Sequence, residues 1–293
     1  MSTPSAAIQA ALGAAALAAQ RYAVAVPAEA RGRGDGRWLG SRGGRSQDFR
    51  DFRDYHPGDD LRWVDWAAYA RSDRLTVRVF QEEICPHVDI VLDTSRSMDL
   101  EGSPKAPAAA GLAAFLAVAA ANAGLTVTVW SDRDGLQRHP GQAARPETWL
   151  TPAFTGCTGL DEALRLQAPT LRRQGLRFLV SDLLWPGPPE EVLQTLAAEA
   201  AALHVLQVLA SADLAPDAEG FLQVVDAETG QAMEIFLDDD ARRQVAGTLD
   251  AHRAAWADAC RRRQAHLHAI SADDLVRDWR PVELLRRGVL EGV

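Results

Sequence analysis

Three oxygen-bearing side chains stand at alternate positions at the end of an apolar run. The run is VDIVLD, and Asp93 ends it, with Ser95 and Ser97 in the residues that follow. A short run of Val, Ile and Leu is typical of a buried strand, so these side chains are expected at a strand's carboxyl end. Carboxylates and hydroxyls without an imidazole or thiolate form a hard ligand set, which favours Mg²⁺, Ca²⁺ or Mn²⁺ over zinc or copper.

Further oxygen groups follow later parts of the chain. Asp182 ends the run LRFLVSD, while Thr155 and Thr158 lie in the glycine-punctuated stretch FTGCTGLDEAL. Hydroxyl ligands add no charge, so a bound dication would keep part of its Lewis acidity for an outside ligand. The same serines and threonines could instead cap helices and close turns, and the spacing alone leaves both interpretations open.

The elements that must position these residues alternate regularly along the chain. Strand-like runs occupy residues 88–93, 125–131, 176–182 and 203–210, and helical segments separate them. Short apolar strands that alternate with amphipathic helices predict an α/β fold with a doubly wound, mostly parallel sheet. In such sheets ligands bind at the carboxyl ends of the strands, where the strand order reverses.

The rest of the chain predicts three parts. Residues 1–26 are an Ala-rich N-terminal helix, and residues 27–83 are an Arg- and Trp-rich segment that packs on the main domain. Residues 84–293 form that main domain. It includes a hairpin at 221–238, marked by a Glu-Thr-Gly turn, and a long amphipathic C-terminal helix with a last edge strand after it.

The amino-acid composition narrows the range of possible functions. Hydrophobic residues make up 47% and charged residues 24%, with a net charge of −9, which argues against a surface built mainly for nucleic acid. Between Arg31 and Arg53, however, seven arginines face three aspartates. This stretch could bind an acidic partner, RNA or anionic lipid, or it could pair with the chain's own carboxylates.

The cysteines and the apolar segments bear on location. Three distant cysteines exclude a disulfide framework and a CxxC zinc pattern, and they suit a reducing compartment. The Ala-rich start lacks the basic residues of a signal peptide, and its apolar run is too short to span a bilayer. We therefore expect a cytoplasmic protein without a transmembrane segment.

The D-x-S-x-S loop, the later threonine and the strand-terminal aspartate resemble the metal-ion-dependent adhesion site of von Willebrand factor A domains. The resemblance implies that Asp93, Ser95 and Ser97 supply the first loop, Thr158 the second and Asp182 the third. Thr158 is preferred because GCTGLDEAL is similar to the family's G-x-T-x-L-x-x-A-L. It further implies that the first and fourth strands lie side by side, and that a carboxylate from another protein completes the metal's coordination.

A second resemblance lies just upstream. RDYHPGDDLRWVDWAAYAR is similar to the signature of the domain-of-unknown-function family 58, with Val64 in place of the usual Ile. Many members of that family carry two transmembrane helices before this region, and this chain departs from that pattern. The charged and aromatic residues form either a structural clamp of Arg–Asp pairs or a partner surface: Arg53, Asp59, Asp60, Arg62, Asp65, Trp66 and Arg71.

These features predict a divalent-metal-dependent protein-binding module rather than an enzyme. The family resemblance implies a MoxR-type AAA+ ATPase as the partner, for which the protein would act as an adaptor to client proteins. The alternative is a Mg²⁺-dependent phosphate-ester hydrolase that uses the same five residues, with Asp99 or Asp132 as its general acid or base. A third class, an RNA-binding protein, would use the Arg31–Arg53 stretch and would need no metal.

Overall fold

The computed structural model describes residues 4–26, 39–43, 49–57, 59, 61–83, 87–132, 135–156, 159–214 and 219–293. It divides into two compact units, of which the first joins Met1–Ala25 to His87–Val293 and the second is Val26–Pro86. The N-terminal helix, expected as a separate part, thus belongs to the same unit as the α/β fold. Whether the second unit packs on the first stays a prediction.

A six-stranded sheet forms the centre of the first unit, in the order β12-β9-β8-β5-β6-β7. Its strands are β5 (His87–Leu92), β6 (Thr126–Asp132), β7 (Leu136–Arg138), β8 (Leu176–Ser181), β9 (Ala202–Leu209) and β12 (His266–Ser271). All neighbouring pairs are parallel except β6 and β7. The predicted α/β class with a mostly parallel sheet is confirmed. Strand β7 was not predicted, because three residues are too few to show the alternation of apolar and polar residues that marks a strand.

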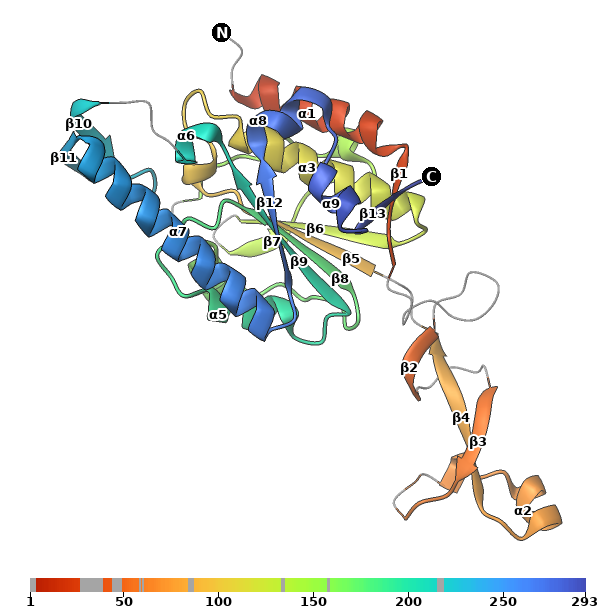
Figure 1. The fold of residues 1–293 in the computed structure, drawn as a ribbon. Coiled ribbons are helices and arrows are strands. Elements are labelled where there is room, and N and C mark those ends of the chain that lie inside the picture. Colours follow the sequence, from red (N-terminus) through yellow and green to blue (C-terminus); the bar gives the residue numbers. More distant parts are fainter. Residues whose placement is uncertain are drawn as a thin grey trace. The chain divides into compact units, whose positions relative to one another are not determined.

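Helices cover both faces of this sheet (Figure 1). One face carries α1 (Pro4–Ala19), α3 (Lys105–Asn122), α8 (Ala272–Asp278) and α9 (Val282–Arg286). The other carries α4 (Leu160–Leu166), α5 (Pro189–Ala197) and α7 (Asp239–Arg262). On this second face Val91 and Leu179 of the sheet share a buried cluster with Trp185, Leu193 and Trp256. The strands are apolar on both faces because both faces are covered.

Helix α3 lies at the centre of the first layer. It contacts β5, β6, β8 and β9 and packs against α1 and α8. Among the described residues it is long and apolar enough to cross a membrane, which we did not expect from the sequence, and 78% of the helix is buried in the fold. Gly111 gives α3 its close approach to Trp279, since a Cβ there would lie 2.1 Å from the indole.

The two ends of the chain are built into the first unit. Strand β1 (Tyr22–Val24) pairs antiparallel with β13 (Leu290–Gly292). In α1 the buried side chains are those of Ile8, Leu12 and Ala15 among others, and they face α3. The N-terminal helix therefore completes the core instead of standing apart from it.

A two-stranded hairpin precedes α7. It consists of β10 (Gly220–Val225) and β11 (Ala232–Leu237), with Phe221 opposite Phe236 in the register. Asp226 holds the turn by accepting hydrogen bonds from the backbone N–H groups of Glu228 and Thr229. Asp238 then caps α7 through the N–H of Ala241. The predicted hairpin and the long helix after it are both confirmed.

The second unit is a three-stranded antiparallel sheet in the order β2-β4-β3. Its strands are β2 (Leu39–Gly43), β3 (Phe49–Asp54) and β4 (Thr76–Glu83), and the 3-10 turn Leu61–Trp63 and helix α2 (Trp66–Ser72) connect β3 to β4. The strand predicted near residues 75–80 is present as β4. Strand β2, in a stretch rich in glycine and arginine, and strand β3, with the sequence FRDFRD, were not predicted.

A candidate metal centre at the rim of the sheet

Asp93 and Asp182 meet where the strand order reverses. Strand β5 lies between β6 and β8, so Asp93 after β5 and Asp182 after β8 follow neighbouring parallel strands. The N–H of Asp93 donates to the carbonyl of Val180 at 3.0 Å, which ties the two strand ends together. Both aspartates are buried, at 2% and 1% exposure. The side-by-side placement of the first and fourth sheet strands agrees with the expectation.

The carboxylate of Asp93 is held on both oxygens. Oδ1 accepts from the N–H of Ser95 at 3.0 Å, and Oδ2 accepts from the hydroxyl of Ser181 at 2.5 Å. Burial, followed by the negative charge of Asp182, raises the pKa of Asp93 to about 6 despite these bonds. Two carboxylates crowded in a buried place favour a proton or a cation between them.

The serine hydroxyls lie together in the same loop. Ser95 and Ser97 approach within 3.1 Å, Oγ to Oγ, at the start of the 3-10 turn Arg96–Met98. Ser95 occupies the cap position of that turn, but its side chain makes no capping hydrogen bond. Helix capping therefore does not explain this buried hydroxyl.

A second loop runs against the first. Ser95 and Gly156 form a parallel bridge, the N–H of Arg96 donates to Gly156, and the N–H of Gly156 donates to Thr94. Thr155 is exposed. Thr158 lies outside the described residues, so its predicted role as a ligand stays a prediction, although the described part of its loop adjoins the Asp93 loop.

Two residues at this rim were not identified as site residues from the sequence. Lys105, at the start of α3, is 1% exposed, and its Nζ lies 2.9 Å from Asp182 Oδ2 and 3.1 Å from Asp213 Oδ1. Asp213 belongs to the short helix α6 (Ser211–Leu214) after β9. A lone lysine at the start of an alanine-rich helix gives no local sign that it will be buried between carboxylates.

The charges of this rim suit a divalent cation. Asp93, Asp182 and Asp213 carry three negative charges when ionised and Lys105 carries one positive charge, which leaves two negative charges uncompensated among these groups. Asp182 also accepts from the N–H of Leu184 through Oδ1, but every carboxylate oxygen has a second lone pair. The described residues contain no group of three or more His, Cys, Asp or Glu side chains placed to hold a metal, so the serine hydroxyls are needed to complete a ligand set.

Arg53, Asp59 and Asp65 make hydrogen bonds within the second unit. Arg53 grips Asp59 with two hydrogen bonds of 2.7 Å, and this contact, with the N–H of His56, lowers the pKa of Asp59 to about 2. Asp65 is buried and caps α2 through the N–H groups of Ala67 and Ala68. Asp60 lies outside the described residues.

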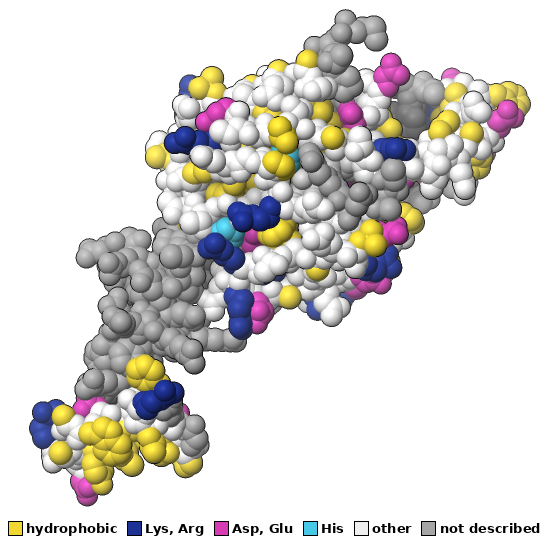
Figure 2. All heavy atoms as spheres, turned by 180° about the vertical axis from the view of Figure 1, so that it is seen from behind, with side chains coloured by type: hydrophobic (Ala, Val, Ile, Leu, Met, Phe, Trp, Pro, Cys, Tyr) yellow, Lys and Arg dark blue, Asp and Glu magenta, His cyan; other side chains and the backbone are white. Residues whose placement is uncertain are grey.

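The other residues of that predicted set face the surface of the second unit. Arg62 and Arg71 are exposed, and Trp66 is 57% exposed beside Tyr69. Figure 2 shows the exposed hydrophobic side chains of this unit gathered on the side in view. The Arg53–Asp59 and Asp65 contacts lie within the second unit and are compatible with the clamp, while the exposed aromatic side chains are compatible with a partner surface, so both interpretations stay predictions.

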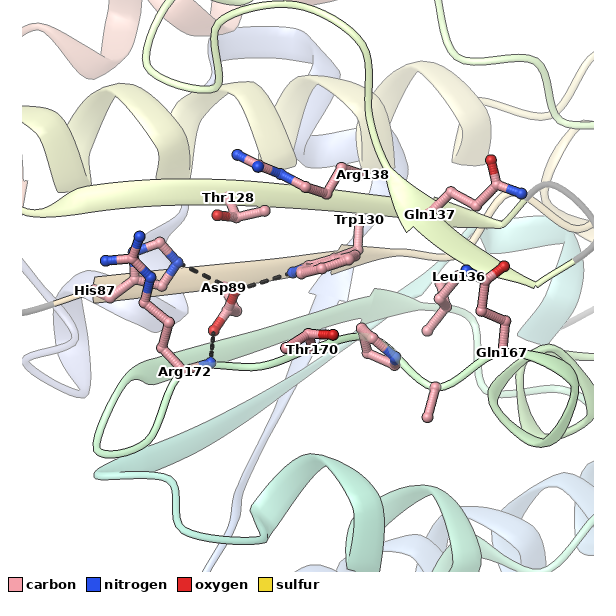
Figure 3. A pocket seen from close by; sticks show the side chains of 12 residues that line it. His87, Asp89, Thr128, Trp130, Leu136, Gln137, Arg138, Gln167, Thr170 and Arg172 are labelled. Carbon is pink, nitrogen blue, oxygen red and sulfur yellow. Dashed lines mark hydrogen bonds and ion pairs between the residues drawn. The ribbon is translucent and has the colours of Figure 1, made fainter.

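A separate polar pocket of about 590 Å³ lies beside β5, β6 and β7 (Figure 3). Asp89, in the middle of β5, is at its floor and accepts from Trp130 Nε1 at 2.9 Å, contacts His87 Nε2 at 3.2 Å, and accepts from the N–H of Arg172 at 3.3 Å. These contacts join two strands to the loop before β8. The sequence analysis did not single out Asp89, although an acid inside an apolar strand was a visible sign.

Comparisons with known proteins agree with the second resemblance. The family model described as "Protein of unknown function DUF58" matches residues 51–255. Uncharacterized proteins of Mycobacterium tuberculosis and Mycobacterium bovis are 32% identical over 257 residues, which is 81% of this chain and 79% of theirs.

Two solved structures were also matched. One is the conserved hypothetical protein BatB from Bacteroides thetaiotaomicron, with 13% identity, a TM-score of 0.32, and coverage of 66% of this chain and 97% of that one. The other is an aerotolerance-related membrane protein from Bacteroides fragilis, with 14% identity, a TM-score of 0.33, and coverage of 70% and 98%.

Proposed function

This chain belongs to the DUF58 family, and from its rim we propose that it is a divalent-metal-dependent protein-binding module with a von Willebrand A-like fold. In this proposal it is not an enzyme. Its partner is a MoxR-type AAA+ ATPase, which it adapts to client proteins in the cytoplasm. The ATPase and the clients come from the family resemblance, whereas the metal and the need for a carboxylate donor come from the rim residues.

The observation that carries the proposal is the burial of Asp93 beside Asp182 at the switch point of the sheet. Burial and then the charge of Asp182 raise the pKa of Asp93, which means that the negative charge of Asp93 is not fully compensated by the surrounding residues. Ser95 and Ser97 add neutral oxygens 3.1 Å apart. In the proposal Mg²⁺, or Ca²⁺ or Mn²⁺, is held by Asp93, Ser95, Ser97 and Asp182, together with Thr158.

The arrangement favours binding over hydrolysis. Neutral hydroxyls leave a bound dication with affinity for a further anionic oxygen, which an Asp or Glu of a partner can provide. Among the described residues, no imidazole hydrogen-bonds to Asp93, Ser95, Ser97 or Asp182, so the described rim does not offer a histidine-activated serine. Metal and partner are therefore expected to bind with positive coupling.

The test is a titration of a MoxR-type ATPase against the full-length protein with Mg²⁺ or with chelator. We expect Mg²⁺ to tighten binding by about tenfold or more, which corresponds to about 1.4 kcal/mol of coupling. Asp93→Ala and the double change Ser95→Ala/Ser97→Ala should remove the effect of Mg²⁺. Asp250→Ala, which removes an exposed carboxylate of α7, is the control and should behave like the unmodified protein.

Each other outcome has a definite meaning. Equal affinity with Mg²⁺ and with chelator would remove the metal from the interface, and no binding at all would reject the ATPase as partner. Hydrolysis of a phosphate ester that requires Mg²⁺ and is lost in Asp93→Ala would instead favour the hydrolase.

A further inference from the structure

We propose that the β10–β11 hairpin is a second protein-docking surface, which takes up an extended, basic and apolar segment of another protein as an added strand. The hairpin projects beside the N-terminal end of α7, apart from the six-stranded sheet (Figure 1). This inference does not rest on the metal or on the ATPase.

The first observation is the exposure of large apolar side chains on both strands. Phe221 is 87% exposed and Phe236 54%, and their rings are in contact with centroids 4.8 Å apart. Val225 on the same face is 57% exposed, and Met233 on the opposite face is 64% exposed. Neighbouring exposed apolar residues of this size are typical of an interaction site rather than of free surface.

The second observation is the incomplete sheet. Strands β10 and β11 pair only with each other among the described residues, so each has an outer edge whose backbone groups lack a ladder partner. A two-stranded hairpin is marginally stable in water, and a third strand stabilises it. An added strand would extend the ladder, and its apolar side chains would lie beside Phe221 or Phe236 and lengthen the row that these two begin.

The charge of the hairpin determines the kind of partner. Residues 219–240 contain seven carboxylates and no Lys or Arg: Glu219, Asp226, Glu228, Glu234, Asp238, Asp239 and Asp240. Two of them pair with arginines of α7, Glu219 with Arg242 and Asp240 with Arg243. Figure 2 shows acidic and hydrophobic side chains together at the projecting upper right of the view. Glu234 lies on the same face as Phe221 and Phe236. A partner segment with Lys or Arg between its apolar residues would be complementary.

A second copy of the chain is a poor occupant. Two hairpins placed face to face would oppose their Glu234 carboxylates without a Lys or Arg from either strand, and each whole chain carries a net charge of −9. Like charges opposed in this way cost binding free energy and slow association. The surface is thus suited to a different, basic protein.

The test uses the full-length protein and a labelled synthetic peptide in which lysine alternates with valine and phenylalanine. Fluorescence anisotropy should detect binding, and the backbone amides of one hairpin strand should gain protection from hydrogen exchange. Phe221→Ser/Phe236→Ser should weaken binding at least about tenfold because it removes the apolar row. Glu234→Lys, which leaves the apolar row in place, should also weaken it.

The controls separate this site from general stickiness. Leu166→Ser/Val282→Ser changes two residues that are also exposed, at 63% and 49%, and should bind the peptide normally. A peptide with glutamate in place of lysine should bind at least about tenfold more weakly. Equal binding by all variants and peptides, or protection outside the hairpin, would overturn the proposal. A concentration-dependent dimer that the double serine variant abolishes would show a second copy to be the occupant.

Discussion

The buried charges at the rim act as one unit. The negative charge of Asp182 repels that of Asp93. Asp182 also forms a 2.9 Å ion pair with Lys105, and Lys105 forms a second ion pair with Asp213. Lys105 thus compensates part of the negative charge without the help of a metal. A change at any one of these residues removes an interaction from its neighbours.

Asp93 should make the metal-free protein less stable as the pH rises. Its pKa is about 6 in the folded protein against 3.8 ordinarily, so between these values the folded state binds more protons than the unfolded state. The free energy of unfolding should therefore fall from about pH 4 to pH 6, by up to about 3 kcal/mol. Asp93→Asn should lack this fall.

The measurement is urea unfolding of both proteins in chelator from pH 4.5 to 7.5. The difference between the two free energies should grow in favour of Asp93→Asn as the pH rises, while other titrating groups cancel. At pH 7, Mg²⁺ should stabilise the unmodified protein and not the variant. Parallel curves at all pH values would contradict the assignment of this charge to Asp93.

Removal of Lys105 should be costly. Lys105→Met leaves Asp182 and Asp213 without their ammonium partner, and the loss of one member of a buried pair costs about 3–5 kcal/mol. Arg165→Met removes a side chain that is 62% exposed beside Asp161 and should cost at most about 1 kcal/mol. Chemical denaturation compares the two, and similar losses would show that Lys105 is not structurally important.

At the scale of the element, helix α3 depends on one close approach. Gly111 lets the indole of Trp279 lie against the helix, at a position where any Cβ would clash. In contrast, Gly247 in α7 has open space around its Cβ position. Gly111 is therefore required by packing, whereas Gly247 only lowers the helix propensity of α7.

Gly111→Ala should destabilise the protein by at least about 1–3 kcal/mol because the indole must move. Gly247→Ala should stabilise it by about 0.5–1 kcal/mol because alanine favours the helix without a clash. Thermal unfolding of both variants checks the pair. Stabilisation by both changes would mean that Trp279 does not pack as described.

At the scale of the whole molecule, the first unit is closed by both ends of the chain. Strand β1 pairs with β13, and α1 covers α3. The chain enters this unit at its N-terminus, forms the second unit from Val26–Pro86, and returns at His87. The N-terminal helix is thus expected to contribute to the free energy of unfolding of the first unit.

Leu12→Ala should cost about 2–5 kcal/mol because Leu12 is fully buried between α1 and the core. Leu17, in the same helix, is 67% exposed, so Leu17→Ala should change stability by less than about 0.5 kcal/mol. The comparison is made by denaturant unfolding of both variants, from the midpoint concentrations, provided that the dependence of the unfolding free energy on denaturant has the same slope in both. Equal effects from the two changes would place α1 outside the cooperative unit.

The sequence by itself determined the alternation of strands and helices, the hairpin, and the aspartates at the carboxyl ends of β5 and β8. These follow from local periodicity and from residue types at strand ends, and the strand order then brought Asp93 and Asp182 together. Only the tertiary structure decided that Lys105 and Asp213 join the rim, that Asp89 bonds to Trp130, and that α1 completes the core. Those contacts link residues far apart in the chain, so no short stretch contains the packing that buries a charge or covers an apolar helix.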